Sequence, residues 1–358
     1  MVPNPLLGVV FLWIGGLASA SFYVPYRSVK GWSWEIFWLV GGFFSWIIAP
    51  WLFASLRTHD LLLVLSQTPP ATLGECYLFG ALWGFGGLTF GLTMRYLGIS
   101  LGTAVALGLT AAFGTIIPPM VSGQLFGSLI HTTDGIVILL GVATALFGIW
   151  IVGIAGHNKE IEQTQKGEDT PLKITDFRKG ILVAIFSGIM SACFAYGLDA
   201  GNPIRRLTLE HGTDPLSQGL PVLVVVLLGG FTTNALWCLF LILKNQTARD
   251  FVGGASADAS LVVAPLTRSY LLCALGGTAW YFQFFFYTMG ESQMGRYAFS
   301  SWTLHMASII IFATFWGLAL REWRGASRRS LTLLTLGLAV LVGSTVVIGL
   351  GNALAAHH

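Results

Sequence analysis

The chain has 358 residues, of which 54% are hydrophobic and only 10% are charged, and its mean hydropathy is +0.74. A soluble domain carries roughly 25% charged residues, so this composition excludes an ordinary soluble protein and indicates that lipid surrounds much of the surface. The formal net charge of +3 is too small to indicate a nucleic-acid partner.

Ten apolar segments follow one another along the chain, each near or above the roughly 20 residues that cross a bilayer. The predicted spans are 6–24, 33–55, 72–94, 101–122, 134–154, 180–200, 219–243, 266–290, 298–320 and 331–352. No basic region or cleavage site precedes the first segment, which is expected to stay as a helix. The sequence therefore predicts an all-α membrane protein of about ten transmembrane helices.

A polar stretch rich in Lys, Glu, Gln and Asp separates the fifth segment from the sixth. We predict a first five-helix unit over 1–156, a cytoplasmic linker over 157–179 and a second five-helix unit over 180–358. Because five is an odd number, the two units would insert in opposite orientations, as inverted repeats do.

A short motif supports that internal repeat. The pattern G-x-x-S-A-x-F occurs at 16–22 and again at 188–194, and Trp83 and Trp280 lie near the starts of the third and eighth segments. Helices rich in small residues also resemble one another by chance, and this alternative stays open. Two inverted five-helix repeats are typical of secondary transporters that alternate access around a central site.

The basic residues predict an orientation in the membrane. Of the 19 Lys and Arg residues, four fall in connections on one side, namely Arg57, Arg205, Arg206 and Arg296. The remaining residues fall on the other side, which the positive-inside rule makes cytoplasmic. Both termini are then expected on the periplasmic side.

Glycines at four-residue spacing predict helix contact surfaces in the third segment, at Gly80 with Gly84 and at Gly87 with Gly91. The four cysteines have no metal-ligand spacing. No phosphate-binding loop, zinc-protease motif or nucleophile elbow is present in the sequence. We therefore expect neither an enzyme nor a resident metal or cofactor.

An aromatic run in the eighth segment is the most distinctive candidate for a binding site. It reads WYFQFFFY over 280–287 and places Gln283 among rings in the middle of a span. Apolar walls with a few placed polar groups are typical of small-molecule sites. Helix packing, with Gln283 bonding a neighbouring helix, is the competing interpretation.

Ionisable groups inside a membrane are functional candidates. His305 lies within the ninth span and Glu35 begins the second, and both are candidates for proton coupling. Histidine has an ordinary pKa of about 6.5, within reach of physiological pH. Arg95 and Asp199 are possible supporting charges, whereas Glu291 at the end of a span is expected to be solvated or capping.

Several strings resemble the bacterial L-rhamnose–proton symporters, a family of the drug/metabolite transporter superfamily. They are SASFYVP at 19–25, KGWSWE at 30–35, FGALWG at 79–84, GGTAWYFQFFFY at 276–287 and SWTLHM at 301–306. The resemblance implies ten helices in two inverted halves in the bacterial inner membrane. It also implies uptake of a deoxyhexose coupled to protons, so the expected partners are a sugar, protons and lipid.

We expect the sugar, L-rhamnose or a related deoxy or pentose sugar, to contact residues from these strings. The candidates are Gln283, Trp280, Tyr281, Tyr287, Trp34, Tyr23 and Trp302. Two alternatives remain: an exporter of amino acids or other small metabolites, and a membrane sugar sensor that does not transport.

Overall fold

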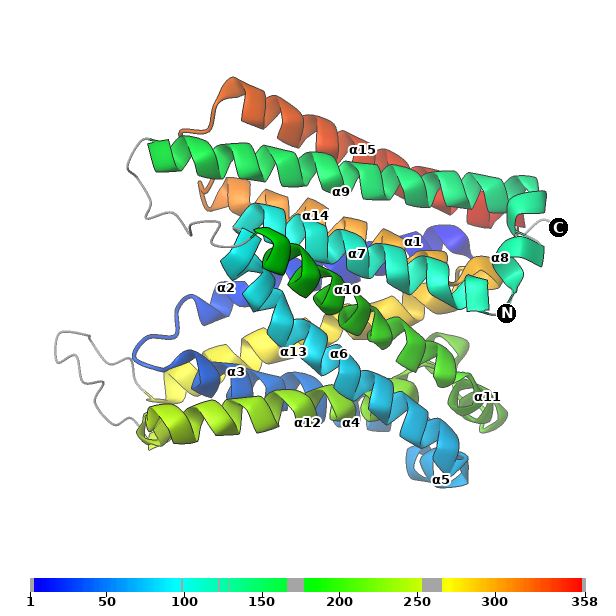
Figure 1. Ribbon diagram of the computed structural model, residues 1–358. Helices are drawn as coiled ribbons and strands as arrows, with labels where there is room; N and C mark the ends of the chain where they lie inside the picture. Colours follow the sequence, from blue (N-terminus) through cyan, green and yellow to red (C-terminus); the bar gives the residue numbers. More distant parts are fainter. Residues whose placement is uncertain are drawn as a thin grey trace.

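The computed structural model describes residues 3–97, 99–121, 123–127, 129–165, 177–252 and 266–355. All regular structure in these residues is helical (Figure 1). Nine of their helical stretches are long and apolar enough to cross a membrane. Helix α13 (Leu266–Ser292) has 27 residues, so it is equally long, but it is less apolar and is not among the nine. The prediction of an all-α membrane protein is confirmed at this level.

Long helices occupy the positions of all ten predicted spans. In the first half these are α1 (Pro5–Ser21) with α2 (Tyr23–Tyr26), α3 (Trp34–Phe43) with η1 (Phe44–Ile48) and α4 (Ala49–Arg57), α6 (Pro70–Leu97), α7 (Ile99–Val121) and α9 (Thr133–Gln165). In the second half they are α10 (Phe177–Ala200), α12 (Leu220–Asn245), α13, α14 (Ser300–Ala319) and α15 (Arg328–Ala355).

The helices on both sides extend into the predicted linker over 157–179. Helix α9 continues to Gln165, and α10 already begins at Phe177. Residues 157–165 and 177–179 of the predicted linker are therefore helical. Residues 166–176 lie outside the part of the chain that the structure describes.

Two short helices that the apolar pattern did not indicate lie together at one end of the bundle. They are α5 (Leu61–Gln67) and α11 (Asn202–Glu210), at the lower right of Figure 1. His211, directly after α11, lies 3.0 Å from the side chain of Gln67 and 3.3 Å from that of Asp60. The backbone N–H of His59 donates to Thr213 at 2.9 Å. This end of the bundle is therefore tied together by polar contacts.

Close approach at small residues holds the long helices together, as expected where lipid removes the hydrophobic drive for packing. Gly80 of α6 lies against the backbone of Val226 in α12, and Gly86 lies against Ser191 of α10. Gly141 and Gly148 of α9 meet side chains of α15. The prediction that Gly80 and Gly84 form a contact surface is confirmed, because Gly84 also packs on α12.

The second glycine pair of α6 behaves differently. A Cβ atom added at Gly87 or Gly91 would meet nothing within 4 Å, and both glycines are exposed. The expected contact surface at these positions was therefore wrong. The physical reason is that α6 and α12 diverge beyond Gly84, so the far half of α6 has no partner on this face (Figure 1).

Most basic residues lie close to helix ends that are gathered at one end of the bundle. Figure 1 places the ends of α6, α9, α12 and α14 and the starts of α3, α10, α13 and α15 at its left. We call this the basic end. Helix α1 begins and α15 ends at the opposite end, together with α11 (Figure 1).

Candidate functional site

A continuous series of aromatic rings crosses the interior of the bundle. From Trp280 of α13 it passes to Trp46 in η1 with ring centroids 5.2 Å apart, and from Trp46 to Trp83 of α6 at 5.9 Å. Trp83 lies 5.5 Å from Phe284, one turn along α13 from Trp280. These rings come from both halves of the chain, so the series joins the two halves.

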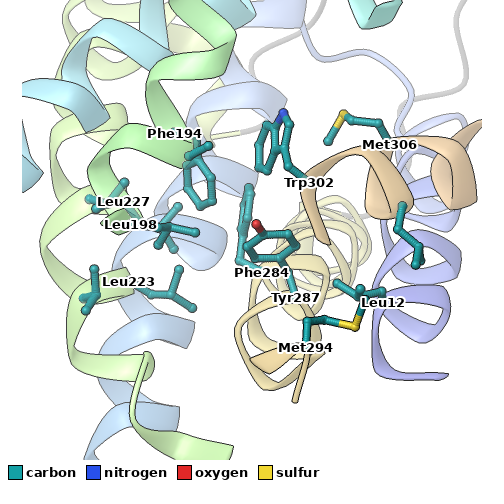
Figure 2. Close-up of a cluster of buried hydrophobic side chains, with 14 of the residues drawn as sticks. Leu12, Phe194, Leu198, Leu223, Leu227, Phe284, Tyr287, Met294, Trp302 and Met306 are labelled. Carbon is teal, nitrogen blue, oxygen red and sulfur yellow. The ribbon is translucent and has the colours of Figure 1, made fainter. Parts of the chain in front are cut away.

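The series continues between α10, α13 and α14, as Figure 2 shows. Phe284 lies 4.5 Å from Phe194 of α10, and Phe194 lies 5.8 Å from Trp302 of α14. Trp302 meets Tyr287 edge-on at 5.6 Å. We call the whole set the aromatic chain: Trp46, Trp83, Phe194, Trp280, Phe284, Tyr287 and Trp302. Its predicted members Trp280, Tyr287 and Trp302 are thus brought together.

Trp46 is a candidate that sequence reasoning missed. Its side chain is 2% exposed and its indole nitrogen has no hydrogen-bond partner in the structure. The π-helix Phe44–Ile48 precedes Pro50, which has no N–H to donate to the carbonyl of Trp46. Such π turns are frequent at functional sites. Proline four residues after a tryptophan was the signal in the sequence.

Gln283 lies one turn along α13 from Trp280 and is 5% exposed. Its backbone carbonyl lies against Gly15 of α1, and its side-chain nitrogen has no hydrogen-bond partner in the structure. The described residues therefore give that nitrogen no bond to a neighbouring helix. Unpaired buried donors are costly and call for an explanation.

His305 lies next to the aromatic chain and is 1% exposed. Its ring centroid is 5.2 Å from that of Tyr287, and its Nδ1 is 3.4 Å from the carbonyl oxygen of Leu12 in α1. Gly15, one turn along α1, leaves room for the imidazole. A titratable group is thus in contact with a ring of the candidate site.

Trp302 is fixed by its own hydrogen bond. Its indole N–H donates to the carbonyl of Thr110 in α7 at 3.0 Å, and its ring fills the space left by Gly114. One turn of α7 further on, the hydroxyls of Thr115 and Thr303 are 2.6 Å apart. These contacts orient the ring of Trp302, which therefore offers a face rather than an N–H to a ligand.

Three other predicted sugar contacts lie elsewhere. Tyr281 is fully buried and stacks on Phe53 at 5.5 Å, on the side of α13 that faces α4. Trp34 is 39% exposed and stacks on Trp38, and Tyr23 is 46% exposed. Trp34 and Tyr23 belong to the basic end, away from His305 and Trp302.

Glu35 is buried at the basic end and does not meet His305. Its carboxylate oxygen accepts hydrogen bonds from Asn245 at 3.0 Å and from Thr247 at 2.9 Å, both at the end of α12. Arg27, a possible partner of Glu35, pairs instead with Glu322 at 3.3 Å. Glu35 thus links α3 to α12.

The predicted supporting charges are also separated. Arg95 is exposed near the end of α6, at the basic end. Asp199, at the opposite end of the bundle, accepts a hydrogen bond from the side chain of Asn202 at 3.0 Å. Near it is a feature missed by sequence reasoning: Arg205 and Glu291 form an ion pair with an N–O distance of 2.6 Å. Glu291 is therefore paired and largely buried rather than solvated.

Comparison with known proteins identifies the family. A family model described as "L-rhamnose-proton symport protein" matches residues 1–354. Proteins named L-rhamnose-proton symporter from Salmonella paratyphi B, Salmonella newport and Salmonella typhimurium are each 40% identical over 348 residues, covering 97% of this chain and 98% of the relative. This chain belongs to the L-rhamnose–proton symporter family. The family comprises transporters and not enzymes.

Membership and the nine apolar stretches together make the chain a multi-pass inner-membrane protein. The resemblance stated from the sequence is confirmed. Among the described residues, no group of three or more His, Cys, Asp or Glu side chains could hold a metal ion.

Replacing Trp46 by Phe keeps a ring and removes the unpartnered N–H. With L-rhamnose as the probe, we expect binding to weaken about fivefold, since one hydrogen bond contributes about 1 kcal/mol. Isothermal titration calorimetry on the purified protein measures the change. Trp51→Phe, one turn along the same helical stretch but 36% exposed, is the matched control and should bind as wild type. Equal affinity in both variants would remove Trp46 from the site.

Proposed function

We propose that this protein takes up L-rhamnose together with protons. The observation that carries the proposal is the match of the family model over 1–354, supported by 40% identity to relatives along 97% of the chain. The site agrees in chemistry: aromatic faces suit the C–H faces of a deoxy sugar, and Trp46 and Gln283 offer unpaired N–H donors to its hydroxyls.

We propose further that ten helices form two inverted repeats, over 1–156 and 180–358. Support comes from which helices pack together. Helix α6 of the first half packs on α10 and α12 of the second, and α13, its counterpart five spans later, packs on α1 and α3 of the first. Helix α7 packs on α10 as α14 packs on α1, while α9 and α15 pack on each other. Each contact thus has a mirror contact between the equivalent helices, as an inverted repeat requires.

The proposed orientation places the basic end in the cytoplasm and both termini in the periplasm, following the positive-inside rule. Cysteines placed at the N-terminus and after Asn352 should then react with an impermeant thiol reagent added to intact spheroplasts. The four native cysteines are buried, so they give little background. Labelling confined to inverted vesicles would reverse the orientation.

The substrate is tested with purified protein in proteoliposomes. We expect labelled L-rhamnose to accumulate when an inward proton gradient is imposed, because the gradient supplies the free energy. A protonophore should abolish accumulation and leave equilibrium exchange. If deoxyhexoses and pentoses all fail while amino acids are moved, the protein is an exporter of the superfamily and not a sugar symporter.

For proton coupling we propose His305, with Glu35 as the second candidate. A coupling group must gain and lose a proton as the site alternates between the two sides of the membrane. His305 contacts Tyr287 of the aromatic chain, so bound sugar can change its surroundings directly. Glu35 lies at the basic end, where its two neutral donors Asn245 and Thr247 accommodate either protonation state of the carboxyl group through rearranged hydrogen bonds.

The two candidates are separated by two variants, His305→Gln and Glu35→Gln. Loss of the coupling group should abolish accumulation driven by a pH gradient. Sugar exchange at equilibrium should survive, because exchange needs the binding site but no net proton movement. Both activities are measured in the same proteoliposomes. If both variants still concentrate sugar with normal pH dependence, neither residue carries the proton and Asp199 is the next candidate.

A further inference from the structure

A buried ion pair closes the end of the bundle opposite the basic end. The Arg205 side chain, on the short helix α11, donates to a carboxylate oxygen of Glu291 at 2.6 Å. The two side chains are 12% and 14% exposed. Because Glu291 belongs to the last turn of α13, this single contact ties α11 to α13.

The ion pair lies between solvent and the aromatic chain. On its outer side is a pocket of about 420 Å³, open to solvent and lined by Arg205, Glu291, Arg206 and Ser292 among others. On its inner side Tyr287 is one helical turn before Glu291 on the same face of α13. Tyr287 contacts Trp302 and His305 of the candidate site. The ion pair therefore lies between this pocket and Tyr287.

A second carboxylate lies close to Arg205 along the chain. Asp199, at the end of α10, accepts a hydrogen bond from Asn202, which is one turn before Arg205 on α11. The Nε of Arg205 is buried and has no hydrogen-bond partner. Helices α10 and α11 meet at Gly201, so Asp199 and Arg205 flank the joint between them. A guanidinium that leaves Glu291 can therefore remain paired, which avoids the cost of an isolated buried charge.

We infer that the Arg205–Glu291 ion pair is the outer gate of the transporter, closed in this structure, and that Arg205 exchanges Glu291 for Asp199 when the gate opens. The inference rests on the proposed transport function and adds a residue pair to it. At the basic end, by contrast, the side chains of Tyr23 and Trp34 are exposed.

The gate is tested first without any substrate, by reaction of a thiol placed beneath it. Tyr287→Cys introduces the thiol, and the four native cysteines are buried. An impermeant thiol reagent is added on the outer side of the membrane. We expect Arg205→Gln with Glu291→Gln to raise the labelling rate at least about tenfold, since the rate follows the fraction of molecules with an open gate. Arg206→Gln, at the exposed neighbour of Arg205, should leave the rate unchanged.

The charge swap Arg205→Glu with Glu291→Arg distinguishes gating from misfolding. The swap should restore slow labelling, whereas a protein that has lost its fold would not be rescued. Unchanged labelling in the neutral double variant overturns the inference, whatever sugar the protein moves.

Locking the gate is the second test. In a background that lacks the native cysteines, Arg206→Cys and Ser292→Cys place thiols on either side of the outer pocket and leave the ion pair intact. A short bifunctional methanethiosulfonate reagent should reduce L-rhamnose exchange at least about tenfold, because α11 and α13 can no longer separate. Binding of L-rhamnose in detergent should persist, since the cross-link changes no residue of the aromatic chain, and a reductant should restore exchange.

The matched control for the lock is Arg206→Cys with Glu210→Cys, which bridges two exposed positions of α11 alone. Its exchange should survive cross-linking. If cross-linked Arg206→Cys/Ser292→Cys continues to exchange L-rhamnose, the inference that the ion pair is a gate is overturned. If the untreated wild-type protein does not exchange L-rhamnose, the proposed substrate is wrong. The thiol-labelling experiment needs no substrate, so it still tests whether the ion pair is a gate.

Discussion

The burial of α13 is the constraint on which the rest of the structure depends. This helix carries Gln283, Glu291 and a run of aromatic residues, so it is poorly suited to face lipid on all sides. Glycines allow its neighbours to approach: Gly15 of α1 lies against its backbone, and Gly277 lies against the backbone of Gly41 in α3. Helices α1 and α3 therefore pack closely on α13, while Phe284 and Tyr287 of α13 contact rings of α6, α10 and α14.

The candidate site is rich in aromatic rings and has buried donors without acceptors. Aromatic rings can pack without hydrogen-bond partners, but the indole N–H of Trp46 and the side-chain nitrogen of Gln283 remain unpaired inside the protein. In a protein that only had to be stable, apolar side chains of similar size would avoid this cost. Unpaired donors beside stacked rings are instead what a site needs if a hydroxylated ligand is to complete its hydrogen bonds.

The long helices could be predicted because each is an apolar run, and α13 was found even though its apolarity is lower. The site was only partly predictable. Trp280, Gln283 and Tyr287 share one helix, so their proximity follows from spacing, whereas Trp46 joins them through a π turn before Pro50. His305 and Glu35 looked equivalent in sequence, but packing separates them. Arg205 was counted among loop charges because the fold-back of α11 toward α13 depends on tertiary contacts that no local pattern encodes.

The net free energy of the buried Arg205–Glu291 ion pair is expected to be small. Taking both charges out of water costs several kcal/mol per ion, and the attraction between them often does no more than offset this cost. Such a pair adds little to stability compared with apolar packing. A contact with a small net free energy can, however, be broken and remade without a large barrier, provided that the guanidinium keeps a partner. We propose Asp199 as that partner, because it is hydrogen-bonded to Asn202, one turn before Arg205 on α11. The end of the bundle that carries this pair is therefore held by polar contacts that can be exchanged, whereas α9 and α15 are joined by close packing at glycines.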